Sequence, residues 1–292
     1  MRALLLAAGI GSRLAPLTEA LPKCLAPING VPLLAYWLDA LTACGIERFL
    51  INTHHLADAV ADYVRRSPWA DCVDLVHEAE LRGTGGTLRA NRGWWQDDGL
   101  VLVHADNLCH CDFAAFIAAH RQRPADILAT MMTFDTPDPQ SCGIVLTGPD
   151  HRLTAFHEKE ADPPGCRASA AVFILAPEFA ALLDTFDACT AIDFSRDLIP
   201  QHLTRFQAWH NAQFHSDIGT PAAFLQAQLD FVWPAPEQAP AAAVSAPVLA
   251  GLTAIAGSEW TIRREVPPGF SAAATFRQSG KRILAASTGK TE

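Results

Sequence analysis

The chain has 292 residues, half of them hydrophobic, so it can bury a large core as one domain or as a domain with an appendage. Its formal net charge of −9 argues against nucleic-acid binding, which needs a basic face. Its eight cysteines are scattered over too long a chain for a disulfide scaffold, and they indicate free thiols in a reducing cytoplasm.

The first 120 residues alternate between strand and helix patterns. The predicted strands are Leu4–Leu6, Arg48–Thr53, Cys72–His77 and Leu100–His104. The predicted helices are Val31–Cys44, Leu56–Arg66, a helix that Gly83–Gly86 opens and that runs toward Trp94, and Phe113–His120. This alternation predicts an α/β fold, Rossmann-like and three-layered (α/β/α), with an open, mostly parallel central sheet.

The second half is richer in strand patterns. They cover Asp126–Phe134, Gly143–Leu146, Leu153–Glu158, Ala168–Leu175 and Phe206–Trp209, and helices are predicted over Glu178–Asp184, Ser195–Leu203 and Pro221–Phe231. Pro221 follows Gly219-Thr220 as the first residue of a helix, where proline is favoured. We expect this half to extend the sheet and to form a β-rich substrate-binding subregion.

Composition changes after Trp233. Residues 234–247 are rich in Ala and Pro, which predicts a linker between a domain over 1–233 and a C-terminal extension over 248–292. The extension shows no hexapeptide repeat, so an appended left-handed β-helix is not supported. No apolar run reaches the roughly 18 residues of a membrane span, and the short run after Met1-Arg2 lacks a cleavage site, so we expect a cytoplasmic protein without a membrane partner.

The most informative stretch is the opening one. Leu4–Leu6 reads as a buried strand, the glycines Gly9 and Gly11 allow a tight turn, and the cations Arg13 and Lys23 follow. A strand, a glycine turn and two cations suit a site for several phosphates. A turn that only reverses the chain is the alternative.

Two familiar phosphate-binding motifs do not fit this stretch. The P-loop pattern has no Gly-Lys-Ser/Thr at the required spacing. The dinucleotide fingerprint fails because Leu14 occupies the third glycine position, and the acidic residue expected after the second strand is missing, which disfavours a dehydrogenase.

Two aspartates are candidate metal ligands. Asp106 ends an apolar strand, and the carboxyl ends of parallel strands face the ligand crevice of such sheets. Asp217 precedes the helix at Pro221 and could instead be a capping or turn residue. Cys109-His110-Cys111 lacks both the spacing and the second ligand pair of a zinc site.

The opening stretch Gly-x-Gly-Ser-Arg-Leu-x-Pro-Leu-Thr (9–18), with Pro22-Lys23 downstream, resembles the signature of the sugar-1-phosphate nucleotidylyltransferases. Pro22-Lys23-Cys24-Leu25 and Ile51-Asn52-Thr53-His54 look most like the mannose-1-phosphate and heptose-phosphate guanylyltransferases. The resemblance implies a GT-A-like enzyme that condenses a nucleoside triphosphate, with GTP favoured, and a sugar 1-phosphate of mannose or heptose type. The products are a nucleotide sugar and pyrophosphate.

The resemblance also implies residue roles. Arg13, Lys23 and Asp106 would be catalytic, and Mg²⁺ would be held by Asp106 and Asp217. The nucleotide would contact Ala7, Ala8, Gly9, Gly11, Ser12, Arg13, Glu78, Gly83 and Thr84, and the sugar phosphate would contact Lys23, Gly143, Glu158 and Lys159. Without the resemblance, Glu158-Lys159 would read as an ordinary solvated pair.

Several alternatives stay open. The enzyme could be a uridylyl-, thymidylyl- or cytidylyltransferase, or the chain could be a regulatory subunit that binds nucleotide sugars without turnover. Ser169-Ala170-Ala171 departs from the Asn and Gly usual in this family, which leaves the sugar open. A homodimer is the default expectation for assembly.

Overall fold

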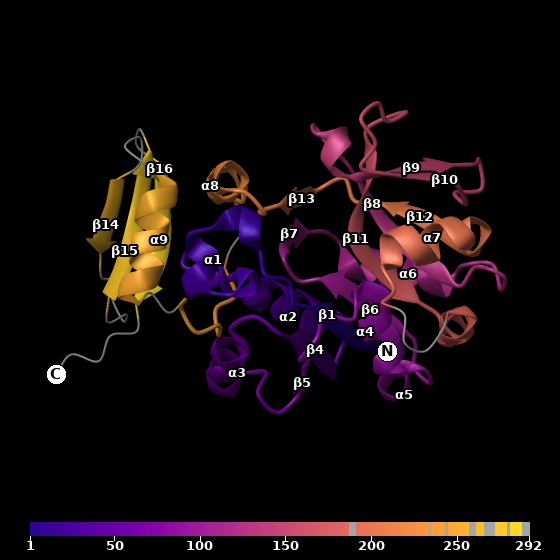
Figure 1. Ribbon diagram of the computed structural model, residues 1–292, viewed down its shortest axis with the longest axis horizontal. Coiled ribbons are helices and arrows are strands. Elements are labelled where there is room, and N and C mark those ends of the chain that lie inside the picture. The colour runs from indigo at the N-terminus through magenta and orange to yellow at the C-terminus, as the bar shows by residue number, and fades with distance from the viewer. Residues whose placement is uncertain are drawn as a thin grey trace.

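The computed structural model describes residues 1–186, 191–233, 235–242, 245–256, 261–265, 272–278 and 281–287. A mixed sheet forms the centre of the molecule (Figure 1). Within the described residues it has nine strands: β1 (Arg2–Leu6), β4 (Phe49–Thr53), β5 (Val73–His77), β6 (Leu100–His104), β8 (Ala129–Asp135), β9 (Gly143–Thr147), β10 (Leu153–Glu158), β11 (Arg167–Leu175) and β12 (Phe206–His210).

The order of the strands divides the sheet into two halves. The path runs β10-β9-β11-β6-β1-β4-β5, and β8 pairs with both β11 and β12. The neighbours β6, β1, β4 and β5 are parallel, whereas β11 is antiparallel to β6, β8 and β9. The predicted α/β class is confirmed, with its parallel part in the N-terminal half and the β-rich part in the second half.

Strand β1 lies in the middle because its side chains are apolar on both faces. Ala3 and Leu5 belong to one buried cluster, and Leu4 and Leu6 belong to a second cluster on the other face of the sheet. Successive side chains of a strand point to opposite faces, so an unbroken apolar run needs cover on both.

Helices provide that cover on both faces. The cluster around Leu5 includes residues from α1 (Leu17–Ala20), α2 (Leu33–Ala43), α3 (Ala57–Arg66), α6 (Phe113–Arg121) and α8 (Pro221–Asp230). The cluster around Leu4 includes residues from α4 (Thr84–Ala90), α5 (Arg92–Trp95), the 3₁₀ segment η4 (Pro177–Thr185), the π-helical turn η5 (Phe194–Leu198) and α7 (Ile199–Gln201). No helix in the described part of the chain is long and apolar enough to cross a bilayer.

Some predicted elements differ in detail. The helix predicted from Gly83 toward Trp94 is two helices, which separate at Asn91. The segments predicted as helices over 178–184 and 195–203 are largely the 3₁₀ and π-helical turns η4 and η5. The short strand β3 (Val31–Pro32) pairs with β2 (Pro27–Ile28), so α2 begins later than predicted. Smaller 3₁₀ turns are η1 (Ser12–Leu14), η2 (Lys23–Leu25), η3 (Pro139–Ser141) and η6 (Leu203–Arg205).

Among the strands that were not predicted, two short ones matter most for the site. They are β7 (Asn107–His110) and β13 (Phe214–Asp217), which pair antiparallel outside the central sheet. Asp217 stands opposite Asn107 in this ladder, so the segment before α8 lies beside the end of β6.

The C-terminal region contains a helix and a small sheet. Helix α9 (Ala246–Ala256) begins within the stretch read as a linker, and an antiparallel sheet of β14 (Thr261–Glu265), β15 (Ala272–Gln278) and β16 (Lys281–Ser287) follows. In Figure 1, α9 lies between that sheet and α1. Residue 234 and residues 243–244 of the predicted linker lie outside the described residues.

Candidate active site

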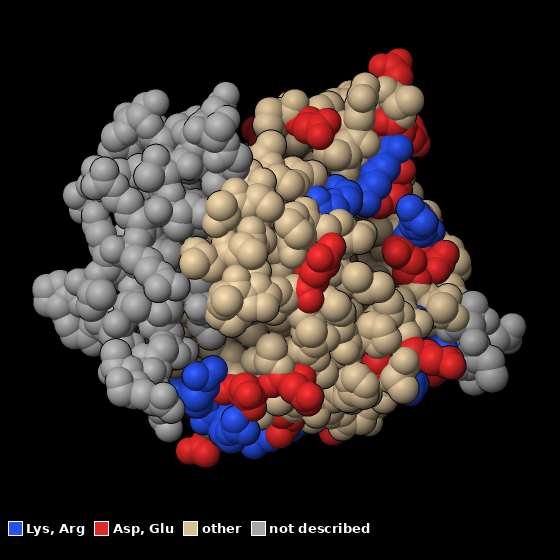
Figure 2. Space-filling view, turned by 60° about the vertical axis from the view of Figure 1, so that its left-hand side comes forward, with Lys and Arg blue, Asp and Glu red and all other residues tan. Residues whose placement is uncertain are grey.

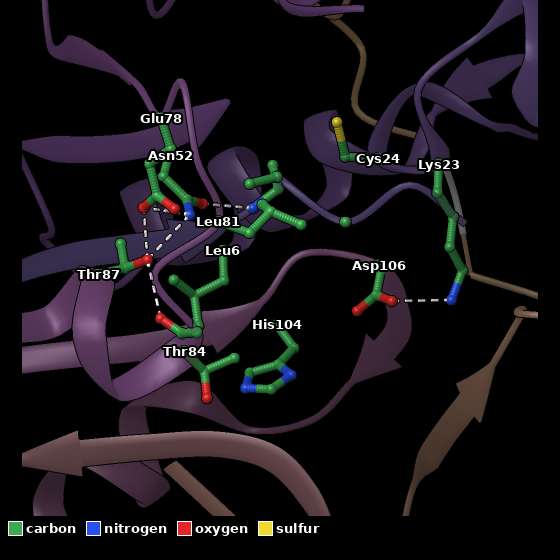
Figure 3. Close-up of a pocket in the computed structure, with 14 residues that line it drawn as sticks. Leu6, Lys23, Cys24, Asn52, Glu78, Leu81, Thr84, Thr87, His104 and Asp106 are labelled. Carbon is green, nitrogen blue, oxygen red and sulfur yellow. Dashed lines mark hydrogen bonds and ion pairs between the residues drawn. The ribbon is translucent and has the colours of Figure 1, made fainter. Parts of the chain in front are cut away.

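Two cavities meet at the carboxyl end of β6. The first, of about 290 Å³, is lined by Leu6, Ala7, Ala8, Gly9, Lys23, Cys24, Asn52, Glu78, Leu81, Gly83, Thr84, Thr87, His104 and Asp106 (Figure 3). The second, of about 220 Å³, is lined by Arg13, His104, Asp106, Asn107, Phe134, Ser141, Cys142, Gly143, Phe156, Glu158, Lys159, Ser169, Ala171, Asp193, Ser195, His215 and Asp217. Asp106 and His104 line both, so the two cavities adjoin at these residues.

Lys23 lies at this junction. Its side chain is 5% exposed, and its ammonium donates to Asp106 Oδ2 at 3.0 Å and to Asp217 Oδ1 at 2.9 Å. Asp106 lies in the turn between β6 and β7, and the β7–β13 ladder brings Asp217 beside it. Figure 3 shows Lys23 reaching across to Asp106. Two carboxylates from distant parts of the chain therefore converge on one positive centre.

Arg13 adds a second cation. Its Nη2 lies 3.2 Å from Asp217 Oδ2, and the side chain is largely exposed. Burial raises the pKa of Asp217, but Lys23 and Arg13 outweigh this effect, so the pKa lies below its ordinary value and the carboxylate is ionised at neutral pH. Burial and then Asp106 raise the pKa of Cys24 to about 12, so this thiol is protonated and is no nucleophile.

A buried polar network supports the first cavity. Glu78 is 3% exposed, and its Oε1 accepts from Asn52 Nδ2 at 3.1 Å and from Thr87 Oγ1 at 2.5 Å. Its Oε2 accepts from the Arg82 N–H at 3.3 Å. Asn52 Oδ1 in turn accepts from the Ala7 N–H at 2.8 Å. The network connects β4, α4 and the start of the opening loop (residues 7–14), and these hydrogen bonds fix the cavity wall before any ligand binds.

Glycine is required at two places around the first cavity. At Gly11, with φ +68°, a Cβ would lie 3.0 Å from Thr18 Cγ2 and 3.2 Å from Lys23 Cβ. At Gly83, with φ +76°, it would lie 2.5 Å from the Ile192 carbonyl oxygen. These glycines serve the packing of the loops, whereas Gly9 has open space beside it in which a ligand could approach the backbone.

The second cavity is built on strained backbone. Lys159 and Ala171 both have φ +54°, the left-handed region that residues other than glycine seldom adopt. Ala171 lies where the register of β11 against β8 shifts between Ser169 and Phe173. Lys159 Nζ lies 3.8 Å from Glu158 Oε1. A Cβ at Gly143 would lie 2.7 Å from Glu158 Oε2, so glycine here leaves room for that side chain.

The two aspartates fit a magnesium ion. Mg²⁺ binds carboxylate oxygens and usually completes its coordination with water and substrate phosphates. Both carboxylates are partly exposed to the second cavity and already turn toward one cation, the Lys23 ammonium. Within the described residues, no group of three or more His, Cys, Asp and Glu side chains could hold a metal alone, so a metal here needs ligands from substrate or water.

Most of the residues that the sequence singled out line one of the two cavities. The first cavity is lined by Ala7, Ala8, Gly9, Lys23, Glu78, Gly83 and Thr84, and the second by Arg13, Gly143, Glu158, Lys159 and Asp217. Asp106 lines both, and Lys23 also bonds to Asp217. Gly11 and Ser12 line neither cavity.

Several lining residues have no role predicted from the sequence. Asn52, Thr87 and His104 line the first cavity, and Asp193 and Ser195 line the second. Asn52 and His104 are polar residues near or at the carboxyl ends of apolar parallel strands, a signal that could have identified them. Burial lowers the pKa of His104, so its imidazole is neutral at pH 7.

A known protein family matches most of the chain. The model of the nucleotidyl transferase family matches residues 2–232, which is most of the chain. The chain belongs to this family. The match includes the opening loop, Lys23, both aspartates and the two cavities, so the site lies within the family domain.

Among curated relatives, a mannose-1-phosphate guanylyltransferase of Mycobacterium tuberculosis is 28% identical over 235 residues, 79% of this chain and 64% of that protein. A UTP–glucose-1-phosphate uridylyltransferase of Synechocystis is 26% identical over 80% of this chain and 59% of that protein. The chain therefore spans about three fifths of the length of these relatives. A solved structure from Bacillus anthracis, provisionally assigned as a glucose-1-phosphate thymidylyltransferase, matches with a TM-score of 0.72 at 18% identity and covers 82% of this chain and 98% of its own. This likeness establishes the shared fold.

Proposed function

We propose that the protein is a sugar-1-phosphate nucleotidylyltransferase, which joins a nucleoside triphosphate to a sugar 1-phosphate and releases pyrophosphate. GTP and a sugar of mannose or heptose type are the favoured substrates. The convergence of Lys23, Arg13, Asp106 and Asp217 at the meeting point of two cavities carries the proposal.

The two cavities suit two phosphorylated substrates. The nucleoside triphosphate would lie in the first cavity, with the opening loop around its phosphates and Arg13 on the departing pyrophosphate. The sugar phosphate would lie in the second cavity, with its phosphate on Lys159 and a ring hydroxyl on Glu158. Lys23, at the junction, would hold the α-phosphate, which is the group transferred.

The reaction then depends on position and charge. An oxygen of the sugar phosphate attacks the α-phosphorus, a new P–O bond forms, and the bond to the β-phosphate oxygen breaks as pyrophosphate leaves in line. The attacking oxygen is already ionised, so the protein need not remove a proton from it. The cations Lys23 and Arg13 offset the negative charge of both substrates.

Asp106 and Asp217 would hold Mg²⁺ in this scheme. The ion would neutralise charge on the phosphates during transfer. In the free protein, these carboxylates hold Lys23 and Arg13 in place at the junction. That all four side chains are present and in contact favours an enzyme over a regulatory subunit that only binds nucleotide sugars.

Within this proposal, the choice of base and sugar rests on the curated relatives. A mannose-1-phosphate guanylyltransferase among the relatives supports GTP and mannose 1-phosphate, while the uridylyltransferase keeps UTP and glucose 1-phosphate as the second candidate pair. Ala171 and Ser169 line the second cavity, so the sequence departure noted at 169–171 falls at the sugar.

A pyrophosphate-release assay tests the proposal. ATP, GTP, UTP, CTP and a thymidine triphosphate would each be combined with mannose, heptose, glucose and galactose 1-phosphates in the presence of Mg²⁺. We expect the highest kcat/KM with GTP and a mannose or heptose 1-phosphate. Highest activity with UTP and glucose 1-phosphate would correct the substrates, and no release with any pair would reject the enzyme.

A further inference from the structure

Helix α9 packs unusually closely on α1. A Cβ at Gly251 would lie 2.9 Å from Leu17 Cα and 3.1 Å from Leu17 N, so the backbones of the two helices touch at this point. Val248 and Leu252 of α9 are buried in the same apolar cluster as Leu17. The two helices lie side by side in Figure 1. Only glycine fits at 251 without moving α1.

Helix α1 is joined directly to the opening loop (residues 7–14). Thr18, the residue after Leu17, donates from Oγ1 to the Gly11 carbonyl at 2.9 Å, and its Cγ2 would lie only 3.0 Å from a Cβ at Gly11. His55 Nε2 donates to the Thr18 carbonyl at 2.7 Å and holds the same residue from the other side. A shift of Leu17 would therefore move Thr18 and, with it, the loop.

The loop and α1 need such outside support. Helix α1 has four residues, fewer than an isolated helix needs to be stable, so its position depends on what it packs against. In the loop, Gly9, Ile10, Ser12 and Arg13 are exposed. Apart from the turn bonds Leu14 N–H to Gly11 and Ala15 N–H to Ser12, the loop backbone is held by the Ala7–Asn52 bond at one end and by Gly11 against Thr18 at the other.

We propose that α9 is a positioning element of the active site, and that Gly251 is the residue that sets the place of α1 and hence of the opening loop. The region after the family domain would thus determine how well the loop binds the triphosphate. This inference rests on the proposed function, because it assigns the loop to the triphosphate of the same site. Glu158 and Lys159, which would hold the sugar phosphate in the second cavity, lie outside the loop, and Arg13 is the one loop residue that lines that cavity.

Steady-state kinetics of the full chain test the inference. Gly251→Leu places a bulky side chain against α1, and Ala254→Leu places the same side chain at an exposed position of the same helix. We expect Gly251→Leu to raise the KM for the triphosphate about tenfold, with the KM for the sugar phosphate changed less than about twofold. Ala254→Leu should leave both unchanged. Gly251→Ala, a smaller insertion, should fall between them.

The KM readout separates positioning from stability. A variant that is only less stable loses active protein and Vmax while its KM stays the same. A second variant, Thr18→Val, removes the bond to Gly11 without touching α9 and should raise the same KM. The double variant should then lose less than the product of the two single effects, because both act on one contact path.

Three outcomes would count against this role. An unchanged triphosphate KM in Gly251→Leu would overturn it, as would equal increases in both KM values. A fully multiplicative double variant would also reject the proposed path through Thr18. If the unaltered protein turned over no triphosphate at all, the proposed function would fail instead, so the two failures are distinguishable.

Discussion

The two cavities are built differently, although they share Asp106. The first belongs to the parallel half of the sheet, and its wall is a buried network in which Glu78 accepts three hydrogen bonds. The second belongs to the antiparallel half, and two of its lining residues, Lys159 and Ala171, have left-handed backbone. One cavity is thus held by satisfied buried polar groups and the other by backbone that the surrounding strands force into place.

This difference indicates which of the two cavities can change its substrate specificity more easily. Substitutions in a buried, hydrogen-bonded network cost much stability. We therefore expect the first cavity to keep the same specificity for its ligand, the nucleotide. Left-handed residues cost about 1–2 kcal/mol each and persist where the fold overrides them, often at ligand sites. We therefore place the variable specificity, that for the sugar, in the second cavity. Figure 2 shows acidic and basic side chains close together on one face of the described surface.

The largest expected effect comes from the residue that both cavities depend on. Lys23→Met keeps most of the buried volume and removes the charge between Asp106 and Asp217. We expect kcat/KM to fall about 1,000-fold, or ~4 kcal/mol of transition-state stabilisation, in the pyrophosphate-release assay. Arg65→Met, at an exposed position on α3, is the control and should stay within about twofold. A folded Lys23→Met with full turnover would remove Lys23 from the mechanism.

A matched pair of glutamate variants compares the cavities directly. Glu78→Gln replaces one carboxylate oxygen with an NH₂ group that would face other donors, so we expect a loss of about 2–3 kcal/mol in the free energy of unfolding. Glu158→Gln, at a partly exposed side chain, should change stability by less than about 0.5 kcal/mol but raise the sugar-phosphate KM about tenfold. Urea denaturation and kinetics measure both. Equal losses of stability would mean that the cavities do not differ as described.

Acid should weaken the antiparallel half through His120. This buried ring lies on α6, its Nδ1 is 2.8 Å from Thr130 Oγ1 of β8, and burial lowers its pKa to about 3. Because the unfolded chain has the higher pKa, near 6.5, stability is full above that value and falls as pH drops toward 3.

The expected size of this loss is about 2 kcal/mol between pH 7 and pH 5. It would be measured as the difference between the protein and His120→Gln in urea denaturation at each pH. Parallel pH profiles for the two proteins would show that His120 is not responsible.

The smallest effect concerns the backbone of the second cavity. Ala171→Gly should relieve the left-handed strain and stabilise the protein by up to about 1 kcal/mol, because glycine adopts φ +54° freely. Ala170 is the buried neighbour and does not have a positive φ, so Ala170→Gly should instead destabilise the protein by about 1 kcal/mol. Thermal unfolding measures both. A loss of stability in both variants would show that Ala171 is not strained.

The sequence predicted much of the parallel half because local patterns define it. Leu100–Val103 is an apolar run, the predicted strand Leu100–His104 forms β6 over those same residues, and Asp106 follows it as expected. The β7–β13 pair was missed because neither short strand has an apolar pattern of its own and each is stabilised only by the other. The sequence could therefore name Asp106 and Asp217 but not show what joins them.

Other parts of the site depend on contacts that no local pattern carries. Asn52 and Glu78 are 26 residues apart and meet only because β4 and β5 pair in register. The sequence named Lys23 as a phosphate-binding cation, but it could not show that this side chain is nearly fully buried beside two carboxylates. The left-handed backbone of Ala171 could not be predicted from an alanine, although the departure at 169–171 pointed to this segment.

A crystal structure of the protein with Mg²⁺ and a non-hydrolysable GTP analogue would test the central claim most directly. We expect the base and ribose of the analogue in the first cavity, its phosphates along the opening loop, and its α-phosphate within hydrogen-bond distance of Lys23 Nζ. A nucleotide bound elsewhere, with Lys23 still bonded to Asp106 and Asp217 and no phosphate beside it, would contradict the account.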